Sequence, residues 1–512
     1  MFTKQVSEYG LLLYPLDSLK YGELVEFIHP RSAFVEEGVG SSILPVGFWG
    51  LPLVYGMIGK IIGVFGTLLI TPLLAICAIW GFYGILKKVF DEQIAFFSAL
   101  LLFFQPVLWY YTTRSLFPNV PFISLILIGA WFLICKPMSR ALLNDVVGMS
   151  IFMLGILMRP NEIMWVALCF AIVAVWYRAE ISLKRLLGWI GVGLFFVVVY
   201  AFINHSLYGS SAGSYVSSRS VELQTWYAYI FPFGIHPRTI IKSLWFFMSK
   251  LTWWYVMPAK IGLLFFLYDW YRKKLSRAQK VSGAVFVVMS MFLVTYYGSQ
   301  IDNLYNLKTI GVAYTRYWLP ISIGMIPFIV YGFFRIAELF DRNSPLAPLL
   351  PKRGETHGSV SPFSSVREGR GMSCFIVYGF GLVYLVVMFI LSVNLVFGGM
   401  DGITATHKNL LHTAEVKNWV LAHTDDDAIL VTDYEDKFFW PDRQVMVRFF
   451  DPRVGSAIAE LLEKKQIDVY YFGIKLEGES EEKVKEYIEQ FRLEIESVQN
   501  FDEHGLYRFI TK

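Results

Sequence analysis

Cysteine and charge are both scarce in this chain. Its 512 residues include 4 cysteines, which lie in or beside apolar runs without metal-ligand spacing or disulfide-scaffold density. Only 17% of the residues are charged, the formal net charge is +4, and the basic residues form short clusters between apolar runs. This distribution gives no continuous basic surface for a phosphate backbone. The composition therefore argues against a disulfide scaffold and against nucleic acid as a partner.

Other familiar signals are missing as well. The chain has no internal repeat, no GxGxxG loop, no P-loop and no conventional metal-ligand set. The first ten residues, MFTKQVSEYG, lack the basic start and continuous apolar core of a secretory signal. We therefore expect no nucleotide-binding motif, no tightly bound metal and no cofactor.

Apolar residues dominate what remains. Hydrophobic residues make up 55% of the chain and aromatic residues 17%, and the mean hydropathy is +0.49, values typical of an integral membrane protein. The pattern predicts an α-helical polytopic membrane protein with about ten transmembrane helices. The expected spans are 67–86, 94–113, 117–134, 143–158, 163–176, 186–204, the second half of 239–270, 281–297, 318–334 and 374–397.

Basic clusters set the orientation of these spans. Lys87 and Lys88 end the first firm span, and five basic residues follow Trp270, so the positive-inside rule assigns both places to the cytoplasm. The segment 341–371 is rich in Pro, Ser, Gly, Lys and Arg and is predicted to be a disordered cytoplasmic linker. The last span then delivers the C-terminal residues to the outer side.

The C-terminal residues 406–512 have the composition of a soluble domain. Helix and strand patterns alternate along them, which predicts a small α/β domain with a largely parallel sheet. The expected strands are AILVTD, QVMVRFF, DVYYFG and YRFIT, and the expected helices are 415–423, AIAELLEKK and EEKVKEYIEQF.

The segment Tyr14 to Ser42 is polar and acidic and precedes the apolar helices. A carboxylate held at a membrane face can act as a base, and cations there can bind phosphate. The same residues also suit a solvated acidic loop and a structural turn. The candidates are Asp17, Glu23 and Glu26 for the base and His29 and Arg31 for phosphate.

Ionisable and aromatic residues at the outer ends of the spans form a second group of candidates. Charges near membrane depth tend to line a cavity or to pair, although snorkelling and aromatic anchoring explain such residues equally well. The candidates are Arg114 and Asn119 in RSLFPN, Arg159 and Glu162 in RPNE, and Tyr314, Arg316 and Tyr317 in YTRYWLP.

Taken in order, the acidic loop, LPVGFWGLPLVYGMIGKIIG, YGILKKVF, RPNE, YTRYWLP and the C-terminal α/β domain resemble the GT-C superfamily of membrane glycosyltransferases. The branch that is most similar contains protein O-mannosyltransferases and lipid A aminoarabinose transferases, which use polyprenyl-phosphate sugars. In that family the segment corresponding to Leu44 to Val64 is an interfacial helix on the outer face.

The chain departs from the family pattern at its start. Family members have a transmembrane helix before the acidic loop, followed by a catalytic aspartate that is often in an Asp-Glu pair, and neither feature is present here. Two explanations stay open. Either the sequence is truncated and about one further apolar helix precedes Met1, or Leu44 to Val64 crosses the membrane itself.

The resemblance implies a division into three parts: residues 1–66 as an outer acidic loop and interfacial helix, 67–398 as the helical bundle with the linker 341–371, and 406–512 as an extracytoplasmic domain. It implies transfer of a sugar from a polyprenyl-phosphate donor to a glycan, lipid or protein acceptor at the outer face of the plasma membrane. A transporter or flippase of lipid-linked glycans and a non-enzymatic scaffold with an outer binding domain are the alternatives.

Overall fold

The computed structural model describes residues 2–16, 18–31, 33–36, 42–45, 47–114, 116–208, 230–300, 309–342 and 371–512. The chain divides into two compact units. The α/β unit comprises Met1–Thr67, Ala201–Val221 and Thr406–Lys512, and the helical unit comprises Leu68–Tyr200 and Glu222–Ala405. The predicted linker 341–371 falls almost entirely outside the described residues.

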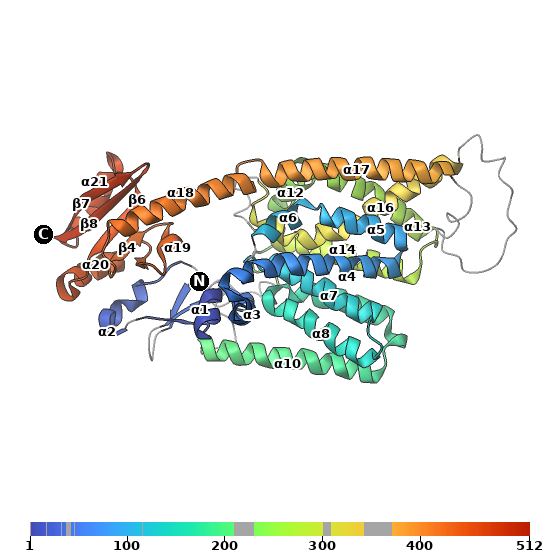
Figure 1. Cartoon of the computed structure of the whole chain (residues 1–512), viewed down its shortest axis with the longest axis horizontal. Helices are drawn as coiled ribbons and strands as arrows, with labels where there is room; N and C mark the ends of the chain where they lie inside the picture. Colours follow the sequence, from blue (N-terminus) through green and yellow to red (C-terminus); the bar gives the residue numbers. More distant parts are fainter. Residues whose placement is uncertain are drawn as a thin grey trace. The chain divides into compact units, whose positions relative to one another are not determined.

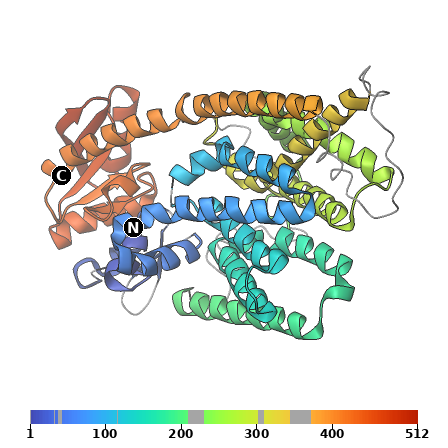
Figure 2. The same cartoon turned by 45° about the vertical axis from the view of Figure 1, so that its right-hand side comes forward.

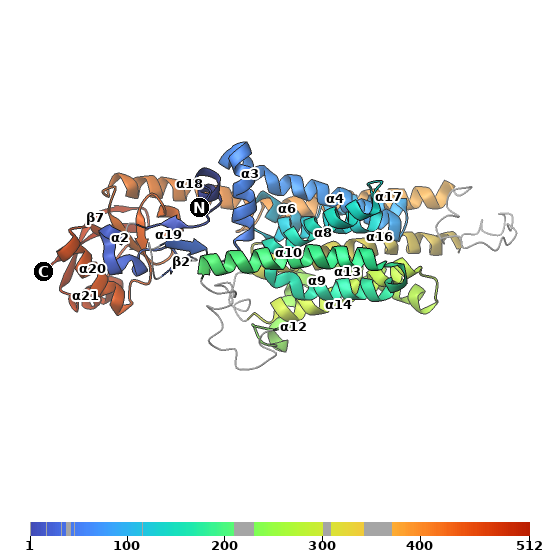
Figure 3. The same ribbon diagram turned by 90° about the horizontal axis from the view of Figure 1, so that it is seen from below.

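The helical unit is a bundle of apolar helices. Figures 1 and 3 show α4, α7, α8, α14, α16 and α17 running along one common direction. The helices that lie wholly or mostly in this unit are α4 Ile70–Val89, α5 Glu92–Phe103, α6 Pro106–Thr113, α7 Asn119–Cys135, α8 Ala141–Met158, α9 Ile163–Trp176, α10 Leu183–Tyr208, α12 Pro237–Phe246, α13 Trp253–Tyr271, α14 Arg277–Gly298, α15 Ala313–Tyr317, α16 Leu319–Arg342 and α17 Gly371–Phe397.

Within the described residues, five helical segments are long and apolar enough to cross a membrane, or up to seven if each of two bent pairs is one span. The pair α5–α6 bends by 49°, and the pair formed by 237–251 and α13 bends by 105°. Three shorter apolar helices, Asn119–Cys135, Pro160–Trp176 and Gly381–Phe397, coincide with further predicted spans. The predicted polytopic helical membrane fold is confirmed.

Close approaches at glycines hold helices of the bundle together. An ideal Cβ on Gly129 of α7 would lie 2.7 Å from the Gly148 carbonyl oxygen of α8. At Gly262 of α13 the same construction meets the Phe328 carbonyl oxygen of α16 at 1.7 Å. In lipid, contact between two apolar helix surfaces brings no hydrophobic free energy. Membrane helices therefore associate through close van der Waals packing, which small residues such as glycine permit.

The α/β unit contains a five-stranded sheet of order β5-β4-β6-β8-β7. The first three of these strands are parallel, whereas β8 is antiparallel to both β6 and β7. The sheet is therefore mixed rather than largely parallel. The elements are β4 Ile429–Thr432, β5 Gln444–Met446, β6 Val469–Ile474, β7 Leu493–Phe501, β8 His504–Thr511, α18 Ile403–Ala422, α19 Asp436–Phe439, α20 Pro452–Lys465 and α21 Glu479–Glu489.

The N-terminal segment belongs to the same unit. It forms the small antiparallel sheet β1-β3-β2, and its residue Ile28 makes a β-bridge with Met446 at the end of β5. Figures 1 and 2 show this blue segment beside the orange and red strands and helices of the C-terminal residues. The elements are α1 Phe2–Tyr9, β1 Tyr14–Pro15, α2 Ser18–Tyr21, a 3-10 helix Gly22–Phe27, β2 Ala33–Glu36, β3 Ser42–Pro45 and α3 Gly50–Gly66.

One hydrophobic core joins the N-terminal and C-terminal residues of the α/β unit. Val25, Ile28 and Ile43 are at most 2% exposed and share this core with residues of β4, β5, α20 and β6. Burial of this kind contributes roughly 1.5–3 kcal/mol for each large aliphatic side chain. Residues 1–66 and 406–512 were predicted as separate parts, whereas their buried apolar residues share one core.

Helix α3 is distinct from α4. Gly63 has φ 79° and ψ 162°, which interrupts the helical backbone before α4 begins. On the preceding turns, an ideal Cβ on Gly56 would lie 2.4 Å from the Val6 Cβ atom, and one on Gly59 would lie 2.8 Å from the Ser7 Oγ atom. These glycines therefore form the surface on which α1 packs, and the orientation of α3 in the membrane stays a prediction.

Candidate active site

The acidic candidates of the N-terminal segment belong to the α/β unit. Asp17 falls outside the described residues. Glu23 and Glu26 are exposed on the 3-10 helix Gly22–Phe27. The hydrogen bond to Asp451 raises the pKa of Arg453, which lies in the first turn of α20, and the charge of Glu26 makes a smaller contribution in the same direction. Both glutamates therefore face solvent at the surface of the α/β unit.

His29 and Arg31 are engaged in a structural corner. The His29 Nδ1 atom lies 3.0 Å from the Pro30 carbonyl oxygen. Arg31 donates its backbone N–H to Asp436 Oδ2 at 2.7 Å and its Nη2 to Asp436 Oδ1 at 3.1 Å, and the guanidinium stacks over Tyr434 with 4.3 Å to the ring centroid. Because the Asp436 carboxylate is fully buried, Arg31 supplies the countercharge that its burial requires.

A half-buried carboxyl lies close to this corner. Burial raises the pKa of Asp433 above its ordinary value, the charge of Glu435 raises it further, and the charge of Arg31 acts in the opposite direction. Asp433 follows the carboxyl end of β4, where the side chains of parallel strands meet. The described residues contain no group of three or more His, Cys, Asp or Glu side chains that could hold a metal ion.

The second group of candidates converges within the helical unit. Arg159 and Glu162 are each 3% exposed and form an ion pair with 2.7 Å between Arg159 Nη2 and Glu162 Oε1. The Tyr297 hydroxyl donates to the same Glu162 oxygen at 2.6 Å, and Trp165 Nε1 donates to the other oxygen at 2.5 Å. Arg159 Nη2 donates in turn to the Tyr297 hydroxyl at 3.0 Å. This buried pair is thus hydrogen-bonded on both oxygens of its carboxylate.

Stacked aromatic rings connect this hydrogen-bonded network to Arg316. The rings of Tyr297 and Tyr317 are stacked with centroids 4.2 Å apart, and the Arg159 guanidinium lies 4.9 Å from the Tyr317 ring centroid. Arg316 donates from Nη2 to the Tyr317 hydroxyl at 3.1 Å and lies 4.9 Å from the centroid of Phe117. Guanidinium groups bind aromatic faces well because the ring quadrupole attracts the cation.

Arg114 and Asn119 complete the group. The Arg114 guanidinium lies 4.9 Å from the Tyr110 ring centroid and 5.8 Å from that of Phe117. Asn119, which begins α7 and is 5% exposed, donates from Nδ2 to the Arg316 carbonyl oxygen at 3.3 Å. We call the set Arg114, Arg159, Glu162, Arg316 and Tyr317 the arginine cluster, in which Arg159 pairs with Glu162 while Arg114 and Arg316 share the ring of Phe117.

Two residues depart from the sequence-based grouping. Tyr314 is 2% exposed and packs its ring against Trp318, with centroids 5.1 Å apart, so its side chain has a packing role beside the cluster. Tyr297, in contrast, is central to the network and was not selected from the sequence. Nothing distinguishes it there, because the run TYYG at the end of a span is typical of an aromatic belt.

The arginine cluster has the chemistry of an anion site. Within the described residues, the Arg316 Nε atom is buried and has no hydrogen-bond partner. A buried donor without a partner costs about 1–3 kcal/mol, and an anionic ligand would satisfy it. Planar guanidinium groups are suited to phosphate because two parallel N–H groups match two phosphate oxygens.

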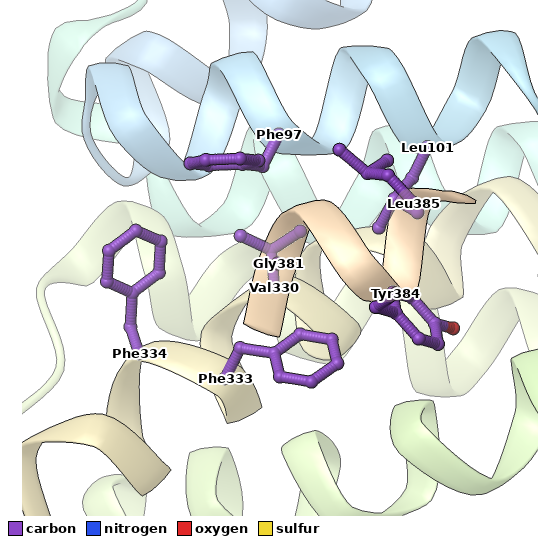
Figure 4. Close-up of a pocket in the computed structure, with 8 residues that line it drawn as sticks. All are labelled: Phe97, Leu101, Val330, Phe333, Phe334, Gly381, Tyr384 and Leu385. Carbon is purple, nitrogen blue, oxygen red and sulfur yellow. The ribbon is translucent and has the colours of Figure 1, made fainter. Parts of the chain in front are cut away.

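An apolar pocket elsewhere in the helical unit has a different character. Figure 4 shows its lining from α5, α16 and α17, and its volume is about 20 Å³, about the room that a single water molecule needs. The only polar side-chain atom on it is the Tyr384 hydroxyl, which donates to the Trp254 carbonyl oxygen at 3.2 Å. The lining residues are Phe97, Leu101, Val330, Phe333, Phe334, Gly381, Tyr384 and Leu385.

Comparison with known proteins links this architecture to solved structures. No family model matches the chain, and a search of the curated proteins found no match. The oligosaccharyltransferase of Archaeoglobus fulgidus, in complex with Zn and sulfate, is similar with a TM-score of 0.53 and 12% identity over 92% of this chain and 62% of that chain. This chain therefore spans less than two thirds of that protein's length.

A second similar structure matches along almost its whole length. ArnT from Cupriavidus metallidurans in the apo state has a TM-score of 0.54 and 12% identity, and the match covers 99% of this chain and 95% of that chain. At this identity the likeness is one of fold. The chain shares the overall fold of these two solved proteins.

Proposed function

We propose that this protein is a membrane glycosyltransferase that moves a sugar from a polyprenyl-phosphate donor to a glycan, lipid or protein acceptor at the outer face of the membrane. The GT-C fold supports a glycosyl transfer role. The observation that carries the proposal is the convergence of Arg114, Arg159 and Arg316, with the buried Nε donor of Arg316, in a bundle of apolar helices. A lipid-linked phosphate suits this site, because its negative charge pairs with the arginines and its apolar chain fits among the apolar helices.

In the proposed reaction the acceptor hydroxyl attacks the anomeric carbon of the donor sugar. The new glycosidic bond forms as the bond between that carbon and the phosphate oxygen breaks, and polyprenyl phosphate leaves with the bonding electrons. Arg316 binds the leaving phosphate, and Arg114 and Arg159 add positive charge around it. The arginines act mainly by positioning the donor and stabilising developing charge, since phosphate is already a good leaving group.

A carboxylate takes the proton of the acceptor hydroxyl in this scheme. Asp17, Glu23 and Glu26 remain the proposed candidates for this base. Asp17 has the best claim by residue type, because the resemblance implies an aspartate soon after the start of the family's acidic loop. His29 and Arg31 are proposed to hold this segment in place, with Arg31 acting through Asp436.

The proposal also assigns a location. We propose that the protein is a multi-pass protein of the plasma membrane, that the α/β unit lies on the extracytoplasmic side, and that the catalytic carboxylate and the arginine cluster work at that side. Membrane lipids are its surroundings and the source of its donor. Neither a nucleic acid partner nor a cofactor enters the scheme.

The decisive experiment is transfer of radiolabelled sugar from polyprenyl-phosphate donors in proteoliposomes of the purified full chain. We expect labelled product, or slow release of free sugar by hydrolysis when no acceptor is present, above the rate in empty liposomes. Movement of the donor lipid between leaflets without transfer or hydrolysis would instead assign the protein to the flippases. Absence of both activities with retained binding of a protein or glycan partner would favour a scaffold.

A further inference from the structure

A buried tyrosine holds the segment that carries Arg316. Tyr111 of α6 is fully buried. Its hydroxyl oxygen lies 3.2 Å from the Ile310 carbonyl oxygen and 3.4 Å from the Val312 carbonyl oxygen. The same hydroxyl lies 3.2 Å from the Thr315 Oγ1 atom. One side-chain group of α6 therefore contacts the segment at three of its residues.

The Thr315 side chain completes this network. Thr315 is also fully buried, and its hydroxyl lies 2.7 Å from both the Ile310 and the Val312 carbonyl oxygens. Two hydroxyl groups thus serve two carbonyl oxygens of buried residues, as buried backbone groups require. Arg316 is the next residue along the chain. The network therefore fixes the backbone from which its side chain extends.

Tyr111 is connected to the second arginine as well. Arg114 follows directly after α6, the helix that contains Tyr111. The Tyr111 ring packs edge-on against the Phe117 ring, with centroids 5.7 Å apart. The Arg114 and Arg316 guanidinium groups lie 5.8 Å and 4.9 Å from the centroid of that Phe117 ring. Tyr111 thus contacts both the segment that leads to Arg316 and the ring that the two arginines share.

The two guanidinium groups on this ring carry like charges. Their repulsion is stronger in an apolar bundle than in water, because apolar surroundings screen charge poorly. The pair therefore keeps a short separation only if the backbone on each side is held. One phosphate can bind guanidinium groups through several oxygens at once, and it binds most tightly when the protein has already brought them together.

We propose that Tyr111 is a positioning residue for the phosphate of the lipid-linked donor. Its hydroxyl holds the segment from Ile310 to Arg316 against α6 and so sets the separation of the Arg114 and Arg316 guanidinium groups. The inference rests on the proposed function, because it requires that these two arginines bind the phosphate. Tyr111 itself does not touch the donor in this scheme, and it acts through the arginines.

The test removes one hydroxyl group. Tyr111→Phe keeps the ring against Phe117 and deletes only the oxygen that contacts the segment. The purified full chain in nanodiscs is titrated with radiolabelled polyprenyl phosphate. We expect Tyr111→Phe to weaken binding roughly three- to tenfold, the effect of losing about one ordinary hydrogen bond.

Tyr255→Phe is the matched control. Tyr255 is 2% exposed, and its hydroxyl donates to the Ser322 carbonyl oxygen at 2.7 Å, so this variant also removes one buried hydroxyl from the helical unit. It should lower the unfolding temperature in detergent, followed by tryptophan fluorescence, and leave the affinity for polyprenyl phosphate unchanged. The comparison separates a positioning effect from a general loss of stability.

Thr315 provides a second pair of variants that tests the same network. Thr315→Ser keeps the hydroxyl and should bind polyprenyl phosphate nearly as the wild type does. Thr315→Val keeps the shape of the side chain, removes the hydroxyl and should weaken binding as Tyr111→Phe does. Equal affinity of the Ser and Val variants would overturn the proposal, because it would show that the hydroxyl network does not position the arginine.

A double-mutant cycle tests whether Tyr111 acts through Arg316. In the Arg316→Ala background, Tyr111→Phe should cause little further loss of affinity, since the separation of the two guanidinium groups no longer matters. Fully additive losses would overturn the proposal.

The remaining outcomes separate this proposal from the proposed function. If Tyr111→Phe lowers the unfolding temperature but binds polyprenyl phosphate as tightly as Tyr255→Phe does, Tyr111 has only a structural role and the phosphate site stands. If the wild type binds no polyprenyl phosphate at all, the proposed function itself fails.

Discussion

Arg316 shows how a single residue can be selected from a membrane sequence. An arginine next to a long apolar run is costly unless it is paired or faces a cavity, and here the guanidinium contacts Tyr317 and Phe117 while its Nε atom remains without a partner among the described residues. The charge made the residue conspicuous in the sequence. Its aromatic surroundings could not be predicted, because Phe117 is nearly 200 residues away along the chain.

Replacing Arg316 by Ala is expected to weaken donor binding by about 1.5–3 kcal/mol, roughly ten- to a hundredfold, because a charge-assisted hydrogen bond to phosphate is lost. Arg316→Lys should restore only part of the affinity, since an ammonium group lacks the planar pair of donors. Equilibrium binding of polyprenyl phosphate in nanodiscs measures both. The exposed Arg272→Ala is the control, and donor affinity in Arg316→Ala equal to that of the control would reduce Arg316 to a membrane anchor.

Glu162→Ala is expected to destabilise the helical unit. The substitution leaves Arg159 buried without its carboxylate and removes the acceptor of Tyr297 and Trp165, and breaking a buried ion pair on one side typically costs about 3–5 kcal/mol. The measurement is the midpoint of unfolding by SDS in mixed micelles. The double variant Glu162→Ala with Arg159→Met should recover part of the loss, and an unchanged midpoint in the single variant would show that the pair contributes nothing to stability.

At the scale of elements, helices and strands were predicted best where apolar residues recur with a regular helical or strand spacing. All the expected elements of the C-terminal domain were present, but β7 was missed because its sequence LEIESVQNF is largely exposed and has no continuous apolar face. The span 94–113 was expected to be one helix and is instead α5 and α6. The break is local in origin, since Gln105 caps α6 by accepting from the Leu108 N–H at 2.5 Å and Pro106 occupies the first turn.

The contact between α1 and α3 gives an element-scale prediction. Gly56→Ala would place a methyl group 2.4 Å from the Val6 Cβ atom, so α1 should separate from α3 at a cost of about 1–3 kcal/mol. Hydrogen exchange of residues 2–9, followed by mass spectrometry, should become faster. Gly47→Ala meets no heavy atom within 4 Å and is the control. Equal protection of α1 in both variants would contradict this packing argument.

At the scale of the whole molecule, the division into units could not be derived from local patterns. The acidic loop looked like a separate surface feature because charged residues interrupt its apolar residues, which are spaced irregularly. Its strongest contacts are with residues about 400 positions away, such as Arg31 with Asp436, and nothing in a single sequence reports such pairs. The helical bundle was easier to predict, because membrane thickness imposes its own length on each span.

Deletion of residues 406–512 is expected to disorder the N-terminal segment. Leu24, Val25 and Ile28 lose the core that keeps them at 7% exposure or less, so limited proteolysis should cut the chain between residues 14 and 45 while the helical unit resists. Mass spectrometry of the fragments identifies the sites. Continued protection of this segment in the shortened chain would mean that its fold does not depend on the C-terminal residues.

The side of the membrane on which this segment lies is the second whole-molecule prediction. With the native cysteines replaced, Ser18→Cys is expected to react with a membrane-impermeant maleimide in intact cells, because Lys87 and Lys88 are predicted to be cytoplasmic. Arg272→Cys, in the basic cluster after α13, should react only after the membrane is opened. If Ser18→Cys also requires opened membranes, the acidic residues are cytoplasmic and the proposed outer-face reaction loses its base.

The shared core of the α/β unit also has a consequence for biosynthesis. Arg31 and Asp436 are 405 residues apart, and at about 5–20 residues per second the ribosome needs roughly 20 to 80 seconds to make the chain between them. During this interval the translocation machinery must insert the helical bundle. Val25, Ile28 and Ile43 stay exposed throughout it, because the residues that bury them have not yet been made. This segment thus leaves the ribosome before the helical bundle but completes its core after it, and until then it depends on chaperones or on its own exposed glutamates to stay soluble.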